Sequence, residues 1–173
     1  MLPPENIFLG LRPRSKPALL TDLASRAAAA LGRDAAAIAA ALLARESLGT
    51  TGFGAGLAIP HARLPGLPAP AGFLARLSRP IDYAAIDGQP VDLVFLLLTP
   101  EGDTQSHLAT LAAITRRLRT PDIVAALRAA PTPQALQAAL LGNLGEGAGI
   151  GSEEGGGFAP RPHQGPSPWT SKS

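Results

Sequence analysis

The histidines are the residues of this chain best suited to chemistry on a ligand, and His61 has the most informative neighbours. It follows Ile59 and Pro60 directly, within the stretch AGLAIPHAR of residues 55–63. Proline fixes its own φ and has no N–H, so sheet pairing should stop just before the ring. We therefore expect His61 at a strand end beside a glycine-rich loop, where an imidazole is held rigidly and stays reachable. A neutral ring nitrogen in such a place can act as a nucleophile.

His107 and Arg45 are the other two candidates for a site. His107 lies on one helical line with Leu111 and Ile114, near the start of the helix, so its ring should point toward the body of the domain. A lone histidine in such a place is more often an interior residue with satisfied hydrogen bonds than a site residue. Arg45 precedes the glycine-rich loop at a helix end, where it either complements the helix dipole or stands beside an anion site.

Other kinds of site find little support in these residues. The chain has no cysteine and only three histidines, without HxH or HxxxH spacing, so we expect no metal. The loop GTTGFGAG of residues 49–56 lacks the lysine of a GxxxxGK[ST] loop and leads into a strand, so we expect no nucleotide cofactor. The net charge is only +2, which argues against nucleic acid, and the nearest thing to a basic cluster is one helix end with Arg116, Arg117 and Arg119.

No segment of the sequence is suited to entering a membrane. The longest strongly apolar run, residues 91–100, has the length of a strand and falls short of the roughly 20 residues that span a bilayer. The first 16 residues hold no apolar stretch of signal-peptide length. We therefore predict a soluble, cytoplasmic protein without membrane insertion.

The distribution of glycine, proline and serine divides the chain in two. Residues 142–173 are rich in these three and lose apolar periodicity, so we predict a disordered tail. Residues 5–141 alternate short apolar runs with helical patterns, which predicts one three-layer α/β domain with a mixed β-sheet flanked by helices on both faces. The predicted strands are at 7–11, 57–60, 71–77 and 91–98, with a turn at 78–80. The first two predicted helices are one that Ser15 caps and Gly32 stops and one that Asp34 caps. Further helices are predicted at 104–119 and 122–130, and a last one is capped by Thr132 and ends at Leu141.

Three stretches together resemble a known family. They are LARESLGTTGFGAGLAIPHAR at residues 43–63, RPIDYAAIDGQPVDLVFLLLTPE at residues 79–101, and HLATLAAITRRLR at residues 107–119. Their order and content are similar to the type-2 enzyme IIA domains of the phosphoenolpyruvate-dependent phosphotransferase system. The nitrogen-regulatory branch is the most similar one, with the fructose and mannitol domains as cousins, and the resemblance covers roughly residues 5–141.

The resemblance implies both a fold and a site. The fold is a mixed sheet flanked by helices, and the site has a phosphorylated histidine at His61, a second histidine at His107 and an active-site arginine at Arg45. It implies no cofactor and no metal. The family usually has Asn where this chain has Ala55, as a polar group near the site, and Gly, with its freer backbone, where this chain has Ala62.

The function that follows is that of a phosphohistidine carrier, a phosphotransferase. The implied donor is a small histidine phosphocarrier protein (HPr-like), and the acceptor is a regulated target protein or a IIB domain. No transporter or IIB-like segment is attached, which favours a stand-alone, nitrogen-related regulator. The alternatives are a sugar-specific (fructose or mannitol) enzyme IIA component of an uptake system, or an interaction module in which His61 is not phosphorylated.

Overall fold

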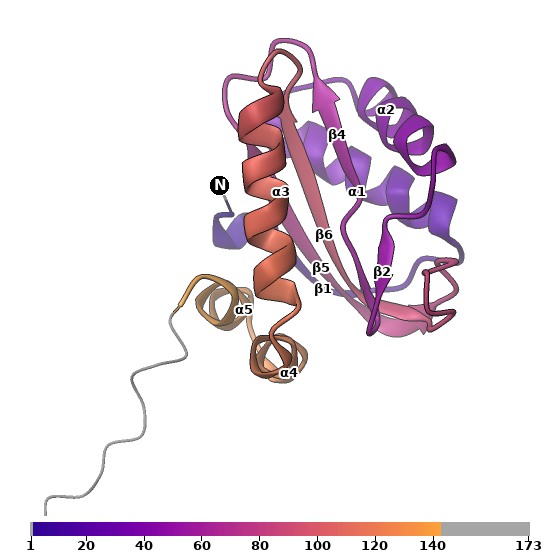
Figure 1. The fold of residues 1–173 in the computed structure, drawn as a ribbon, viewed down its shortest axis with the longest axis vertical. Helices are drawn as coiled ribbons and strands as arrows, with labels where there is room; N and C mark the ends of the chain where they lie inside the picture. The colour runs from indigo at the N-terminus through magenta and orange to yellow at the C-terminus, as the bar shows by residue number, and fades with distance from the viewer. Residues whose placement is uncertain (1, 143–173) are drawn as a thin grey trace, which may run out of the picture.

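A mixed sheet of six strands forms the centre of the protein in the computed structural model, which describes residues 2–142 (Figure 1). The strands are β1 (Ile7–Leu11), β2 (Gly52–Gly54), β3 (Leu57–Ala58), β4 (His61–Leu64), β5 (Ala71–Ile81) and β6 (Val91–Pro100). The helices are the short 3-10 turn η1 (Pro4–Asn6), then α1 (Lys16–Leu31), α2 (Ala35–Ser47), α3 (Thr104–Leu118), α4 (Pro121–Ala129) and α5 (Pro133–Leu141).

Strand β6 is the central strand of the sheet and pairs with three other strands. The order is β1-β5-β6-β3-β2, and β4 pairs with β6 beyond β3. β6 runs antiparallel to β5 and parallel to both β3 and β4, while β1 is parallel to β5 and β2 is antiparallel to β3. The sheet is therefore mixed, as predicted.

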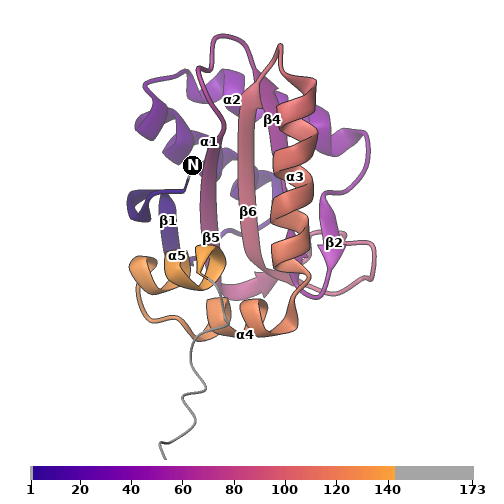
Figure 2. The ribbon, with the colours of Figure 1, turned by 60° about the vertical axis from the view of Figure 1, so that its left-hand side comes forward.

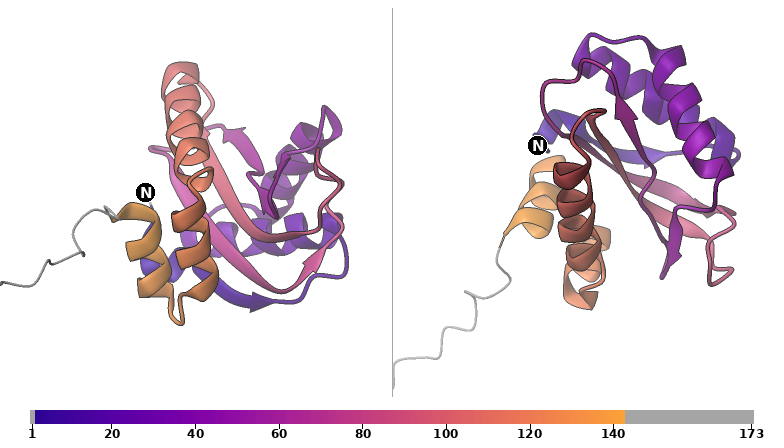
Figure 3. Two further views of the ribbon diagram at one scale, coloured as in Figure 1. Left: turned by 60° about the horizontal axis from the view of Figure 1, so that its bottom comes forward. Right: turned by 45° about the horizontal axis from the view of Figure 1, so that its top comes forward.

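Helices cover both faces of the sheet, which confirms the predicted three-layer architecture. Figure 3 shows α1 and α2 on one side of the strands and α3, α4 and α5 on the other, and Figure 2 shows the second group from its own side. Alternate residues of β6 point into two separate cores because side chains of a strand alternate between its faces. Val94, Leu96 and Leu98 join the core under α1 and α2, whereas Leu93, Phe95 and Leu97 join the core under α3–α5.

The helix ends follow their capping residues. Ser15 accepts a hydrogen bond from Ala18 N at the start of α1, and Asp34 and Thr132 cap α2 and α5 in the same way. Gly32 ends α1 in the left-handed conformation that suits glycine (φ 63°). None of the helices formed by residues 2–142 is long and apolar enough to cross a membrane.

Three local predictions differ from the structure. The glycine-rich loop predicted at residues 49–56 contains the short strand β2, and the other two differences concern where a strand stops. The strand predicted at residues 57–60 ends at Ala58, and a new strand, β4, begins at His61. Pairing with β6 is interrupted at Ile59 and Pro60, where the Pro60 carbonyl still accepts Leu97 N at 3.0 Å. His61 therefore opens a strand instead of following one.

The turn predicted at residues 78–80 is part of β5. The strand continues to Ile81 through an irregularity in its pairing with β6 after Arg76. Ser78 is exposed, and its hydroxyl donates to the Gly10 carbonyl at 2.8 Å, which supplies a partner from the neighbouring strand. A proline is tolerated at such a bulge because the missing ladder bond has already been lost there. The tail predicted at 142–173 lies outside the described residues from position 143 onward.

Candidate functional site

His61, His107 and Arg45 line one cleft, which has a volume of about 480 Å³. Three elements meet there: the last turns of α2, the beginning of β4 and the first turn of α3. The structure thus brings together the three residues that the sequence singled out from positions far apart. The full lining is Ala41, Ala44, Arg45, Leu48, His61, Ala62, Arg63, Glu101 and His107.

The two ring nitrogens of His61 have different partners. Nδ1 lies 2.8 Å from the carbonyl oxygen of Ile59, and a carbonyl can only accept, so Nδ1 carries the proton. Nε2 lies 2.9 Å from Nε of Arg45, which can only donate. The ring is therefore neutral, with its proton on Nδ1 and its lone pair on Nε2 facing the cleft.

The surroundings of His61 also disfavour its protonated form. Burial is the largest cause that lowers the pKa of His61, and the charges of Arg45 and His107 lower it further. The Ile59 carbonyl and the carboxylate of Glu46 act in the opposite direction but do not outweigh them. A histidine with a lowered pKa keeps its lone pair at neutral pH.

Arg45 reaches the cleft from the last turn of α2. Its Nε–H donates to His61, and its Nη1 donates to the carbonyl of Gly49 at 3.0 Å, just past the end of the helix. One guanidinium thus links the imidazole to the glycine-rich loop. Such a fork can exchange its acceptors for the oxygens of an anion without changing its charge.

His107 lies beside His61, with ring centroids 5.4 Å apart and planes inclined by 51°. It is buried (8% exposed) in the first turn of α3. Its Nδ1 shares a hydrogen bond of 2.8 Å with the hydroxyl of Thr99 on β6. Burial lowers the pKa of His107, and the charges of Arg63 and Arg45 add to that effect. The ring is thereby fixed and kept largely uncharged next to His61.

The cleft as a whole is suited to an anion. Arg45 and Arg63 both line it, and Arg63 Nη1 donates to the Thr104 hydroxyl at 3.1 Å, at the N-terminus of α3. Glu101 is the one carboxylate in the lining. No group of three or more His, Asp or Glu side chains among residues 2–142 is arranged to hold a metal ion. A neutral imidazole nitrogen that contacts one guanidinium, in a cleft that a second guanidinium also lines, is an arrangement that can accept and hold a phosphoryl group.

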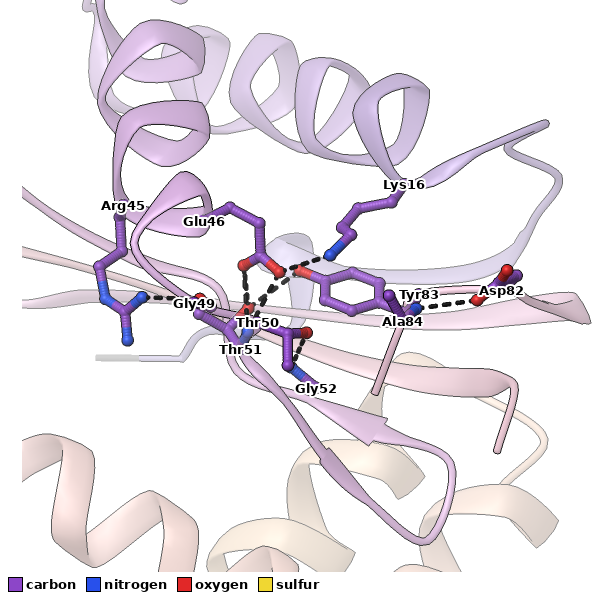
Figure 4. Close-up of polar contacts among 10 residues, drawn as sticks. All are labelled: Lys16, Arg45, Glu46, Gly49, Thr50, Thr51, Gly52, Asp82, Tyr83 and Ala84. Carbon is purple, nitrogen blue, oxygen red and sulfur yellow. Dashed lines mark hydrogen bonds and ion pairs between the residues drawn. The ribbon is translucent and has the colours of Figure 1, made fainter. Parts of the chain in front are cut away.

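Behind the cleft is a polar network that the sequence analysis missed (Figure 4). The Glu46 carboxylate accepts from Lys16 Nζ at 2.8 Å and from the Thr51 hydroxyl at 2.6 Å, as well as from Thr51 N. The Tyr83 hydroxyl lies 3.0 Å from the Thr51 hydroxyl. Burial is the main cause that raises the pKa of Tyr83 well above its ordinary value. One signal in the sequence could have pointed here, namely an acidic residue in the last turn of a helix, where the dipole disfavours it.

Ala55, where the resembled family usually has Asn, lies away from the cleft. It sits at the tip of the β2–β3 hairpin in a left-handed conformation (φ 55°), and its N–H donates to Asp87 at 2.9 Å. Leu57 pairs with Leu93 and His61 with Leu97, so the hairpin tip is at least about 13 Å along β6 from the histidine. The expectation of a polar group near the site at this position was wrong.

Ala62 lies in the cleft but has ordinary strand geometry. It pairs with Leu98 on β6 and is not among the described residues with positive φ. The backbone freedom of glycine is therefore not needed at this position.

Comparison with known proteins agrees with this fold. The family model described as "Phosphoenolpyruvate-dependent sugar phosphotransferase system, EIIA 2" matches residues 1–142. The nitrogen regulatory protein of Bradyrhizobium diazoefficiens is 49% identical over 140 residues, which cover 81% of this chain and 92% of the relative.

Solved structures of similar proteins share the fold of this chain. The nitrogen regulatory protein IIA-Ntr of Neisseria meningitidis superposes with a TM-score of 0.76 at 33% identity, over 80% of this chain and 94% of that one. In the complex of enzyme IIAMTL with phosphorylated enzyme IIBMTL from Escherichia coli, the matching chain has a TM-score of 0.69 at 18% identity. That match covers 83% of this chain and 99% of the other, and it shows a shared fold.

Proposed function

The chain belongs to the EIIA 2 family of the phosphoenolpyruvate-dependent sugar phosphotransferase system, and from this premise we propose that it carries a phosphoryl group on Nε2 of His61. The observation that carries the proposal is the pair of hydrogen bonds on the ring. Nδ1–H is engaged by the Ile59 carbonyl, which leaves the lone pair of Nε2 directed into a cleft lined by two arginines.

The proposed reaction is a transfer between two histidines. The donor is a small histidine phosphocarrier protein, and its N–P bond breaks as the bond from His61 Nε2 to phosphorus forms. The electron pair of the broken bond returns to the donor's ring nitrogen, and the proton stays on His61 Nδ1. Because the chemistry asks little covalent work of the protein, catalysis depends on placing the nucleophile in line and on positive charge near the oxygens.

Arg45 changes partner during this reaction. Its Nε–H occupies the lone pair of Nε2 before transfer, at 2.9 Å, so it has to withdraw before phosphorus can approach. The released guanidinium is then free to bind the phosphoryl oxygens, for which its fork is well shaped. His107, held by Thr99 beside His61, is placed to donate a hydrogen bond to the same oxygens.

We further propose that this carrier acts as a nitrogen-related regulator in the cytoplasm. The support is its similarity to nitrogen regulatory proteins along most of both chains. The phosphoryl group on His61 would then set the affinity for a regulated target protein. The other possibility within the family is a sugar-specific component that passes the group to a IIB domain.

The test of the carrier role is labelling of the protein from phosphoenolpyruvate in the presence of the upstream phosphotransferase proteins. The wild-type chain should take up one phosphoryl group, and His61→Ala should take up none. His163→Ala, which replaces the third histidine of the chain, is the matched control and should label fully. Full labelling of His61→Ala would refute the assignment.

A second assay separates the regulator from the uptake component. Labelled protein is mixed with purified fructose- or mannitol-type IIB domains, and the label on each protein is followed with time. A regulator should keep its label, whereas an uptake component should pass it to one of the IIB domains.

A further inference from the structure

Glu46 occupies a place that is unfavourable for a carboxylate. It lies in the last turn of α2, where the helix dipole repels negative charge, and its side chain is only 8% exposed. Its pKa is nevertheless lowered, because the hydrogen bonds from Lys16 and Thr51 together outweigh the effect of burial. A buried ion pair is by itself weak evidence for a stabilising role, so the pair with Lys16 alone does not account for a carboxylate at this position.

The carboxylate of Glu46 holds Thr51 at two groups. It accepts from the Thr51 hydroxyl at 2.6 Å and from the Thr51 backbone N–H at 3.1 and 3.2 Å to its two oxygens. Because the Thr51 proton is directed at the carboxylate, the Tyr83 hydroxyl is the donor in its 3.0 Å contact with Thr51. Figure 4 shows the Glu46 carboxylate with its contacts to Thr51 and to Lys16.

Thr51 connects this network to the proposed nucleophile through two backbone groups. The Thr51 carbonyl accepts the N–H of Ile59 at 3.0 Å, and the Ile59 carbonyl accepts Nδ1–H of His61 at 2.8 Å. The relay therefore runs from Glu46 through Thr51 and Ile59 to the ring. It crosses the gap between β3 and β4, where no pairing with β6 holds Ile59 in place.

Two consecutive residues of α2 thus act on the two nitrogens of one ring. Arg45 donates directly to Nε2, whereas Glu46 is linked to Nδ1 only through Thr51 and Ile59. Consecutive side chains on a helix point about 100° apart, which sends one into the cleft and the other behind it. One helix end thus carries a residue that contacts the ring and a residue that contacts the network behind it.

We propose that Glu46 is a positioning residue that, through Thr51 and Ile59, keeps the proton of His61 on Nδ1 and its lone pair on Nε2. The inference rests on the proposed phosphoryl transfer for its functional meaning, but the position of the proton can be measured without any transfer. Without the fixed carbonyl, only the hydrogen bond from Arg45 to Nε2 opposes a turn of the ring or a move of its proton to Nε2, and a part of the population loses the lone pair that we propose as the nucleophile.

The experiment combines nitrogen-15 NMR of the histidine rings with the transfer assay. The ring signals of His61 are identified by their loss in His61→Ala, and the proton position is read above the pKa from the shifts of Nδ1 and Nε2. In the wild-type chain, Nδ1 should be protonated and Nε2 unprotonated. In Glu46→Gln we expect a mixed population and a rate of transfer lower by about ten- to a hundredfold, as for a small misplacement of a reacting group.

Three further variants sharpen the test. Asp92→Asn, which breaks the ion pair with Arg128 at 2.7 Å away from the relay, is the control for general loss of an ion pair and should change neither readout. Thr51→Ser keeps the hydroxyl and should behave like the wild type. Thr51→Val removes the hydroxyl while retaining the carboxylate, and it carries the same test should Glu46→Gln not fold.

The outcomes are distinguishable. A shifted proton position with slower transfer in Glu46→Gln or Thr51→Val, but not in Thr51→Ser, supports the relay. Unchanged ring shifts in a folded Glu46→Gln would overturn it, whatever the rate. A wild-type chain that accepts no phosphoryl group would instead refute the proposed function, and the ring shifts would still decide whether Glu46 positions His61.

Discussion

Arg45 and His61 share a hydrogen bond of 2.9 Å that places a guanidinium on the lone pair of the imidazole. The same contact that holds the ring in the free protein therefore covers the nitrogen that we propose as nucleophile. It also keeps the ring neutral, because a protonated Nε2 could not accept from Arg45. Arg45 thus covers Nε2 in the free protein, and in the proposed transfer it binds the oxygens of the incoming group.

Two replacements of Arg45 distinguish the effect of its charge on phosphoryl acceptance from the effect of its hydrogen-bond geometry. Arg45→Gln should slow phosphoryl acceptance by about ten- to a thousandfold, the range seen when one donor to a developing charge is removed. Arg45→Lys keeps the charge but cannot donate to both His61 and Gly49. Its rate of acceptance should therefore lie between the rates of the wild type and of Arg45→Gln. Arg26→Gln, which breaks an exposed pair with Asp22 on α1, is the control. Initial rates of labelling measure all three, and a wild-type rate in Arg45→Gln would contradict the role of the guanidinium.

The second histidine is tested in the same assay. His107→Gln should slow transfer by about ten- to a thousandfold while the label still appears on His61. Thr99→Val removes the hydroxyl 2.8 Å from His107 Nδ1 and should give a smaller loss, because the ring remains but is no longer fixed. If a well-folded His107→Gln transfers at the normal rate, His107 only fills space between α3 and β4.

The pH dependence follows from the lowered pKa of His61. Burial, Arg45 and His107 hold that pKa below 6.5, so the neutral ring dominates at pH 7 and is lost only as the pH falls through the lowered value. Acceptance should therefore be flat near pH 7 and decline on the acid side. Arg45→Gln removes one neighbouring positive charge and should move the pKa of His61 upward. An NMR titration of the His61 ring measures this without interference from the donor's histidine, and a downward shift would contradict the electrostatic argument.

The strained alanine at the hairpin tip gives a prediction on stability. Ala55 has φ 55°, a conformation that costs an L-residue about 1–2 kcal/mol and costs glycine almost nothing. The relief of this strain is partly offset by the greater entropy that glycine gives the unfolded chain. Ala55→Gly should therefore raise the free energy of unfolding by about 0.5–1 kcal/mol. Asn also tolerates this region, so Ala55→Asn should stabilise as well.

Ala62→Gly is the matched control for that measurement. Ala62 is buried in β4 with ordinary strand geometry, so its replacement by glycine should lower the free energy of unfolding by about 1 kcal/mol. Urea unfolding of both variants compares the two alanines directly. A destabilised Ala55→Gly would show that the hairpin tip does not bear the strain inferred from its φ.

The parts of the fold that the sequence predicted correctly depend on local physics. Ser15, Asp34 and Thr132 mark helix starts because a side-chain oxygen must accept from the first free N–H groups, whatever the rest of the chain does. Residue type and position made His61, His107 and Arg45 candidates, and the family resemblance favoured a functional role for His107 and Arg45 over an ordinary structural one. The structure places these three in one cleft, and their roles in transfer stay predictions.

The parts that were missed depend on partners distant in the sequence. Proline at position 60 correctly indicated a break in pairing, but the resumption of the strand at His61 is decided by β6, more than 30 residues later. The polar network behind the cleft joins Lys16 to Glu46 and Tyr83 to Thr51. Only the packing of α1, α2 and the segment after β5 brings these residues together. Thr99 lies just past the strand predicted at residues 91–98, and only the docking of α3 gives it His107 as a partner.

The last prediction concerns the C-terminal segment, residues 145–173, which lies outside the described part of the chain. Its composition, with GEGAGIGSEEGGG followed by APRPHQGPSP, disfavours a packed structure, because glycine loses the most backbone entropy on ordering and proline cannot join a sheet ladder. A chain ending at Leu144 should therefore melt at nearly the wild-type temperature and accept phosphate at the wild-type rate. It retains the carbonyls of Leu140 and Gly142, both of which accept from Arg117.

A chain ending at Gln137 is the control for that truncation, because it also removes the buried Leu140 from the end of α5. It should lose at least about 2 kcal/mol of stability, the contribution of the buried leucine alone, because the last turn of α5 and the acceptors of Arg117 are removed with it, and it should melt clearly lower. Thermal unfolding followed by circular dichroism compares the melting temperatures of the wild-type chain and of the chains ending at Leu144 and Gln137. If the chain ending at Leu144 melts as low as the one ending at Gln137, the C-terminal segment packs on the domain and the boundary near residue 142 is wrong.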